Sequence, residues 1–262
     1  MKHLKFRIIL YVLLAGIAAG FLVHVVRQRY ATPTPQIIND DTATYGSETL
    51  PNTNSTTSKP TAPTSPSPVS PPTTFSLKVP FTAQAPTGNW DTIHNEDCEE
   101  ASAIMANAYY NGPHDVKLDP GYVEGQLTKL TDWEMQTFGY NLDINSTETV
   151  QMIEANFDLQ AKVVTDYNQE FIKNELLQNH VVLLPANGQL LGNPNYKQPG
   201  PKYHMLVIRG FTSTSIITND SGTRNGLNYS YSYNTLYNAN GEWSHQSNSV
   251  DLNKKHIIVV WK

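Results

Sequence analysis

Hydrophobic and polar positions divide the chain into three parts with different patterns. Ile8 to Val26 is an apolar run without Asp, Glu, Lys or Arg. The stretch that follows, up to Phe75, is dominated by Thr, Pro and Ser and shows no apolar period. From Ser76 to Lys262 the apolar residues return with the spacing of helices and strands. The pattern therefore predicts one folded domain, residues 76–262, behind an apolar segment and a linker.

Helices are predicted mainly in the first part of this domain and paired strands in the second. From Cys98 to about Tyr110, apolar residues recur with helical spacing until the breaker sequence Asn111-Gly112-Pro113. Further helices are predicted at 122–130, 147–157 and 169–178, and strands at 77–81, 160–165, 181–184, 204–208, 215–218 and 256–261. The runs 204–208 and 215–218 form a predicted hairpin. This order indicates an α+β fold with helices packed on an antiparallel sheet.

The N-terminal segments predict a tethered protein. Residues 1–7 form a short cationic tail, and the apolar run 8–26 is long enough to cross a ~30 Å hydrocarbon layer as one transmembrane helix. A cleaved signal peptide is the alternative, although its apolar core is normally ~7–15 residues and a small-residue cleavage site follows it. Residues 27–75 cannot bury enough apolar surface to fold and predict a disordered stalk. We therefore expect a single-pass membrane protein with its folded domain outside the cytoplasm.

Charge and cysteine content narrow the classes of function. The formal net charge is −5, and the first thirty residues carry five cations and no acids, so the remainder is at −10. An acidic surface argues against nucleic acid as a partner and leaves the N-terminal helix as the predicted contact with the membrane. A single cysteine excludes an internal disulfide.

That single cysteine, Cys98, is the candidate nucleophile because it lies at a predicted helix start. Asp97 and Glu100 have the spacing of a capping box around it. Unpaired N–H groups and the helix dipole favour a thiolate in the first turn, whereas the nearby carboxylates oppose it. An imidazolium is therefore needed to hold the sulfur as an anion. An inert cysteine on an apolar helix face is the alternative.

His204 and Asp220 complete the predicted site. His204 begins one strand of the predicted hairpin, and Asp220 follows the other strand, so the two side chains should lie opposite each other. Asp220, or its neighbour Asn219, would then fix the tautomer of the imidazole. A satisfied histidine at a strand end and a plain turn at 219–222 are the alternatives. The other histidines show no comparable partner and no metal-ligand spacing, so neither a metal nor a cofactor is predicted.

Four segments stand out by their order and local sequence: Val79-Pro80-Phe81-Thr82-Ala83-Gln84, Asp97-Cys98-Glu99-Glu100-Ala101-Ser102, Tyr203 to Phe211, and Thr218-Asn219-Asp220. They resemble motifs of the papain-like bacteriocin-leader (double-glycine) peptidase family, and especially its stand-alone relatives outside transporters. The resemblance implies a papain-like fold, with Cys98 as nucleophile, His204 as general base, Asp220 as orienter and Gln84 as oxyanion donor. Two features depart from the family pattern: Glu99 stands where the transporter-borne members have Gly, and Gln84 is farther before Cys98 than usual.

The sequence thus predicts an extracytoplasmic cysteine peptidase that cleaves a peptide or protein substrate through an acyl-enzyme. A transglutaminase-like enzyme uses the same Cys, His, Asp order, and a wall-peptide hydrolase has a related site. A papain-like binding module without turnover is the remaining alternative, and the carboxylates beside Cys98 favour it.

Overall fold

A computed structural model describes residues 71–112 and 117–262. The predicted cationic tail, the predicted anchor 8–26 and the predicted stalk as far as residue 70 lie outside these residues. Among the described residues, no helix combines the length and the apolar character needed to span a bilayer. The helices are α2 (Cys98–Asn111), α3 (Pro120–Thr137), α4 (Ser146–Asn156), α5 (Gln169–Leu177), α6 (Gly188–Leu191) and α7 (Tyr233–Ala239).

Local signals place most of the helix ends. α2 begins at Cys98 and ends at Asn111, as predicted. α4 begins with a complete capping box, in which Asn145 accepts from the Glu148 N–H and Glu148 accepts from the Asn145 N–H. α3 is longer than the predicted 122–130, because Asp119 caps it and Pro120 occupies its first turn.

The strands form one large antiparallel sheet. Its strands are β1 (Phe75–Ser76), β2 (Gln160–Val164), β3 (Val181–Ala186), β4 (His204–Phe211), β5 (Ile216–Asn219), β6 (Tyr229–Tyr231) and β9 (Ile257–Trp261). The order is β2-β9-β3-β4-β5-β6, and β1 pairs with the end of β4. The predicted hairpin is confirmed, since Ile208 lies opposite Thr218 and Val207 opposite Asn219. β7 (Glu242–Ser244) and β8 (Ser249–Asp251) form a separate small ribbon.

The opening strand was predicted at 77–81, but the regular pairing of β1 ends at Ser76. Beyond it the chain runs over the core, with Leu77, Val79 and Phe81 buried. Its main-chain groups bond to neighbours one at a time: the Leu77 N–H donates to the Arg209 carbonyl, and the Asn219 amide donates to the Val79 and Pro80 carbonyls. The side chain of Asn219 therefore replaces part of the backbone hydrogen bonding that a regular strand at 77–81 would make.

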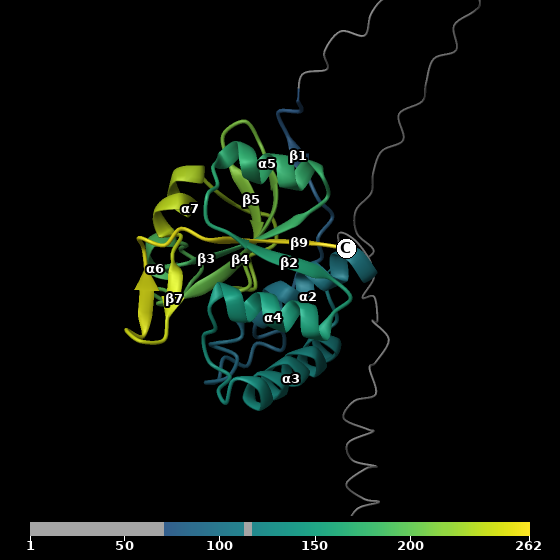
Figure 1. Ribbon diagram of the computed structural model, residues 1–262, viewed down its shortest axis with the longest axis vertical. Coiled ribbons are helices and arrows are strands. Elements are labelled where there is room, and N and C mark those ends of the chain that lie inside the picture. The colour runs from purple at the N-terminus through teal and green to yellow at the C-terminus, as the bar shows by residue number, and fades with distance from the viewer. Residues whose placement is uncertain (1–70, 113–116) are drawn as a thin grey trace, which may run out of the picture.

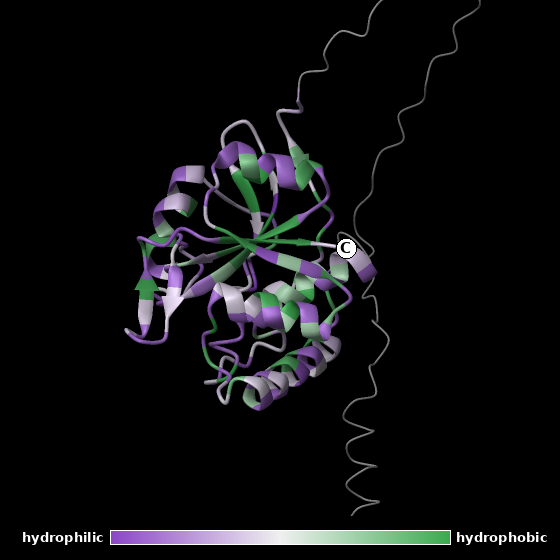
Figure 2. Ribbon diagram, viewed as in Figure 1, coloured by the Kyte–Doolittle hydropathy of each residue, from purple (hydrophilic) through white to green (hydrophobic). Residues whose placement is uncertain are grey.

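The helices cover the sheet and place the start of α2 against β4. Figure 1 shows α2, α3 and α4 gathered on one side of the sheet and α5 on the other. The central strands β3, β4 and β9 are mostly hydrophobic, as their colour in Figure 2 shows, and their residues are buried except for the half-buried Trp261 at the end of β9. The polar residues at the beginning of β4 and after β5 are therefore held by a rigid core.

Candidate active site

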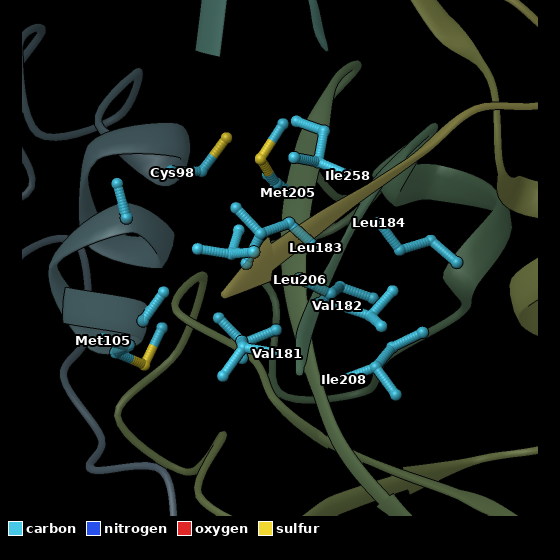
Figure 3. Packing of buried hydrophobic residues seen from close by; sticks show 14 of the residues in the cluster. Cys98, Met105, Val181, Val182, Leu183, Leu184, Met205, Leu206, Ile208 and Ile258 are labelled. Carbon is cyan, nitrogen blue, oxygen red and sulfur yellow. The ribbon is translucent and has the colours of Figure 1, made fainter. Parts of the chain in front are cut away.

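Cys98 is the first residue of α2 and lies almost completely buried, with 2% of its surface exposed. Its sulfur points toward Met205 on β4 (Figure 3). The Ser102 hydroxyl, one turn later, is within hydrogen-bond distance of the Cys98 carbonyl (2.8 Å) and of the Met205 carbonyl (3.3 Å). Because Met205 follows His204 directly, this contact holds the first turn of α2 beside the start of β4.

The predicted capping box around Cys98 is wrong. Asp97 is the N-cap residue, but its side chain accepts no hydrogen bond from the helix, and both its carboxyl oxygens are buried without a partner. Glu100 contacts Glu134 of α3 instead of the Asp97 N–H. The first turn is packed under α3, so these carboxyl groups face a neighbouring helix rather than their own helix end.

Burial makes these groups weak acids. It raises the pKa of Asp97 to about 7 and that of Glu134 to about 7. The pKa of Glu100 is also raised, first by burial and then by the charge of Glu134. Neither oxygen of Glu134 has an N–H or O–H donor. Burial and the neighbouring carboxyl groups therefore favour the neutral form of these acids.

The thiol of Cys98 donates a hydrogen bond to Glu99 Oε2 at 2.9 Å. Glu99 Oε1 accepts from the Ile144 N–H at 2.8 Å, so the fully buried carboxyl group is fixed at both oxygens. Burial, followed by the charges of Glu99 and Asp143, raises the pKa of the thiol well above its usual value. The expected thiolate is therefore not the resting state of this geometry, because desolvation and nearby carboxylates outweigh the helix end.

The structure brings His204 and Asp220 together. His204 Nε2 lies 2.9 Å from Asp220 Oδ1, and both side chains are buried. Among the described residues, the imidazole of His204 is hydrogen-bonded to Asp220, and the thiol of Cys98 is hydrogen-bonded to Glu99. No direct hydrogen bond joins the imidazole to the thiol. His204 is bonded to Asp220 through Nε2, which leaves Nδ1 as its other ring nitrogen.

Asp220 is the acceptor of a dense set of donors. Its Oδ2 accepts from the hydroxyls of Tyr196 and Tyr231, each at 2.7 Å, and from the Asn193 amide at 2.9 Å. Its Oδ1 also accepts from the Gly222 N–H. Burial alone would raise the pKa of Asp220, but the charge and hydrogen bond of His204 and the two hydroxyls lower it below its usual value. Asp220, and not Asn219, is thus the partner of the imidazole.

Two residues enclose the imidazole. The rings of Tyr196 and His204 meet edge to face, with their centroids 5.5 Å apart. A Cβ added to Gly222 would lie 3.0 Å from His204 Cε1 and 3.1 Å from its Nε2. A side chain at position 222 would therefore push against the rings of His204 and Tyr196, so space rather than backbone conformation favours glycine there.

Gln84 lies beside the same turn, since its N–H donates to the Ser221 carbonyl at 2.9 Å. Its side-chain amide donates to the carbonyls of His94 at 2.9 Å and Asn95 at 3.0 Å. The amide hydrogens thus hold the loop before α2, while Oε1 is buried without a partner. The oxyanion role of Gln84 stays a prediction.

Two cavities lie near Gln84 and the loop before α2. The first has a volume of about 580 Å³, and its lining includes Gln84, Trp90, Tyr196 and Gly222. The second has a volume of about 690 Å³, and its lining includes Glu96, Tyr140, Asp143 and Trp243. Asn95 and Pro201 line both cavities. The two cavities are therefore neighbours at Asn95 and Pro201, and the buried Cys98 and His204 line neither of them.

The expectation that the other histidines lack comparable partners is wrong for four of them. They pair with carboxylates as follows: His94 with Asp91 and Glu124, His180 with Glu175, His245 with Glu148, and His256 with Glu242. These pairs form between segments distant in sequence or across short turns, so spacing alone did not reveal them. Within residues 71–112 and 117–262, no three His, Cys, Asp or Glu side chains are grouped so that they could hold a metal ion.

Sequence reasoning missed the residues that surround the predicted site. Asn193 and Tyr196 bond to Asp220 from a loop and Tyr231 from β6, and no local pattern of these segments indicates that their side chains meet a carboxylate. The hydrogen bond from the thiol to Glu99 was also missed, although the sequence placed this carboxylate beside the sulfur as an opposing charge. A second signal was that Glu99 stands where the transporter-borne members of the family have Gly.

The chain was compared with curated proteins, with solved structures and with models of protein families. A search of curated proteins found no match. Among solved structures, the chain is similar to a Bacillus anthracis protein assigned to the C39-like peptidases, at 15% identity and a TM-score of 0.46, over 72% of this chain and 98% of the other. The model of the family described as Peptidase_C39 like matches residues 76–250, which include Cys98, His204 and Asp220. The chain therefore belongs to the C39-like peptidase family, whose members are cysteine peptidases with an α+β, papain-like fold.

Proposed function

We propose that this protein is a membrane-anchored cysteine peptidase whose domain hydrolyses peptide bonds outside the cytoplasm through Cys98, His204 and Asp220. Membership of the family supports cysteine peptidase chemistry in general. The observation that carries the assignment of residues is the buried contact of 2.9 Å between His204 Nε2 and Asp220 Oδ1, next to the helix that begins with Cys98.

Each residue has a distinct role in this proposal. The Cys98 sulfur attacks the carbonyl carbon of the substrate and forms an acyl-enzyme. His204 moves the protons, and Asp220 fixes its tautomer and stabilises the imidazolium. The five donors around Asp220 keep that carboxylate ionised, which supports an orienting role. Water then attacks the acyl-enzyme and releases the second product.

The oxyanion site consists of the Cys98 N–H and the Gln84 amide in this proposal. The Gln84 amide presently donates to the His94 and Asn95 carbonyls. In this proposal the Gln84 amide exchanges these hydrogen bonds for one to the oxyanion when substrate binds.

The location rests on the sequence of the N-terminal part. Residues 8–26 anchor the protein in the membrane, and residues 27–75 hold the domain away from it. The experiment is a protease-protection assay on intact cells: an external protease should remove the domain without lysis. Protection until lysis would place the domain inside and contradict the proposal.

The activity is tested with the full chain in mild detergent and a panel of fluorogenic peptides. We expect cleavage by the wild type and none by Cys98→Ala or His204→Ala. Addition of excess amine separates hydrolysis from acyl transfer, since a dominant amine adduct would identify a transferase. Equal signals from the wild type and Cys98→Ala would refute the peptidase assignment.

A papain-like binding module without turnover is the second candidate. The observation that favours it is the buried thiol of Cys98, whose pKa is raised and whose hydrogen bond goes to a carboxyl group. In that case the domain should bind peptides equally well with Cys98 and with Ala at this position and should cleave none of them.

A further inference from the structure

The first cavity, of about 580 Å³, is positively charged although the protein is acidic. The residues from position 31 onward carry a formal net charge of −10, yet the charged side chains that line this cavity are those of Lys197 and Arg224. No Asp or Glu is among its described lining residues. Within residues 71–112 and 117–262, neither cation forms an ion pair. The charge of the cavity is therefore not neutralised by the described part of the chain.

The two segments that carry these cations are fixed on one carboxylate, that of Asp220. Tyr196, directly before Lys197, donates its hydroxyl to Asp220 Oδ2 at 2.7 Å. Gly222, two residues before Arg224, donates its N–H to Asp220 Oδ1 at 3.1 Å. Both cations are exposed, but the backbone that carries each of them is held close by a buried hydrogen bond. The position of the two charges is thus set before any substrate binds.

The cavity adjoins the proposed catalytic residues. Gly222 lines it, and a Cβ built on Gly222 would lie 3.0 Å from His204 Cε1. Gln84, the proposed oxyanion donor, lines the same cavity. A peptide whose scissile bond lies near His204 and Gln84 therefore places a neighbouring part of the substrate in this cavity.

We propose that the first cavity is a subsite for a carboxylate of the peptide substrate, which Lys197 and Arg224 bind. This inference rests on the proposed peptidase function and names a class of substrate for it. An ammonium and a guanidinium group both form charge-assisted hydrogen bonds with a carboxylate, and a guanidinium group can bind both of its oxygens. The carboxylate belongs to an Asp or Glu side chain or to the C-terminus of the peptide, and two series of peptides separate these sources.

The second cavity, of about 690 Å³, has a different lining, which makes the inference directional. Glu96 and Asp143 line it together with one cation, Lys202. A substrate carboxylate would face two carboxyl groups there, which repel it unless a further proton is bound. A peptide that extends over both cavities therefore places its carboxylate on the side of His204 rather than on the side of Asp143.

The test uses the full chain in mild detergent and blocked peptides that carry Glu, Gln or Lys at each position in turn. Competition between two peptides in one reaction gives the ratio of their kcat/KM values, whatever the amount of active enzyme. We expect that at one position the Glu peptide is preferred to its Gln counterpart by roughly tenfold, with the Lys peptide below both. A second series compares free and amidated C-termini. The preference should decrease between about 0.02 M and about 0.5 M NaCl, because salt screens exposed charges.

Substitution of the two cations should remove the preference. In the double variant Lys197→Gln and Arg224→Gln, the ratio for Glu over Gln should fall to about one. Arg224→Glu should favour the Lys peptide instead. Lys202→Gln is the matched control, because Lys202 is an exposed cation of the same loop that lines the second cavity, and it should keep the wild-type ratio. Equal ratios for all peptides of both series, or a preference that persists in the double variant, would overturn the inference.

Binding measurements separate this inference from the peptidase proposal. The chain with Cys98→Ala is titrated into dye-labelled Glu and Gln peptides, and binding is followed by fluorescence anisotropy. Tighter binding of the Glu peptide that depends on Lys197 and Arg224, in a protein that cleaves no peptide, would retain the subsite and remove the peptidase function. Cleavage without any preference for a carboxylate would retain the peptidase and remove the subsite. A protein that neither binds nor cleaves these peptides would contradict both proposals.

Discussion

Asp220→Asn tests whether the carboxylate next to His204 holds the site together. Asp220 Oδ1 accepts from His204 Nε2 and the Gly222 N–H, and Oδ2 accepts from Tyr196, Tyr231 and Asn193. The best orientation of the new amide keeps its oxygen toward His204. Its NH₂ group then faces the two tyrosine hydroxyls, which can rotate and accept, and the Asn193 amide, which cannot.

The magnitude follows from these contacts. The substitution removes the charge of a buried carboxylate that is hydrogen-bonded to His204 and leaves the Asn193 N–H against another donor. Removing one partner of a buried pair costs about 3–5 kcal/mol of unfolding free energy. Loss of the charge that orients the imidazole should also reduce turnover by roughly 10²–10⁴-fold. Because the pKa of Asp220 is lowered in the folded state, its stabilisation is present above the unfolded pKa of ~3.9 and is lost as the pH falls through the folded value.

The assay is urea unfolding of the full chain in mild detergent, followed by tryptophan fluorescence, together with peptide cleavage. All four tryptophans lie in residues 76–262, so the signal reports the folded domain. Asp158→Asn, at an exposed position, is the control and should change neither quantity. A loss below about 1 kcal/mol with turnover within threefold of the wild type would refute the reasoning, since ordinary surface changes stay within ±0.5 kcal/mol.

Two further predictions concern the groups around the site. Gly222→Ala should lower peptide cleavage by at least about tenfold with little change in the urea midpoint, because its Cβ would lie 3.0 Å from His204 Cε1 and push against the ring. Gly125→Ala, which has open space around its Cβ, is the control. Glu134→Gln should make the protein more stable at pH 8 than the wild type, measured by urea midpoints at pH 5 and pH 8. Glu134 has a folded pKa of about 7, so the wild type loses stability as the pH rises from ~4.3 toward that value, and an equal slope in both proteins would contradict this.

The candidate site was predictable to the extent that it depends on local signals and on strand register. A breaker cluster and an apolar period fixed the extent of α2 and therefore the position of Cys98 on its first turn. The distance between His204 and Asp220 followed from hairpin geometry, since the beginning of one strand lies opposite the end of the next. Both features depend on residues close to one another along the chain or across one turn.

The tertiary structure decided which groups these residues contact. The sequence of the first turn of α2 predicts a capping box, but packing under α3 directs Asp97 and Glu100 away from the helix end. The same packing buries Glu99 against the thiol and raises the pKa of Cys98 where the sequence alone predicted a thiolate. Desolvation depends on all the elements that surround a group, so no local pattern predicts it.

By itself, the sequence determined an α+β domain with a helix that begins at Cys98. It also placed His204 at the start of a central strand and Asp220 directly after the neighbouring strand of the hairpin. The folded chain decided that Asp220 collects donors from Asn193, Tyr196 and Tyr231, and that Glu99 rather than the imidazole bonds to the thiol. The division has a physical reason: helix ends and hairpin register follow from short-range backbone geometry, whereas the protonation of a buried site depends on distant segments that exclude water from it.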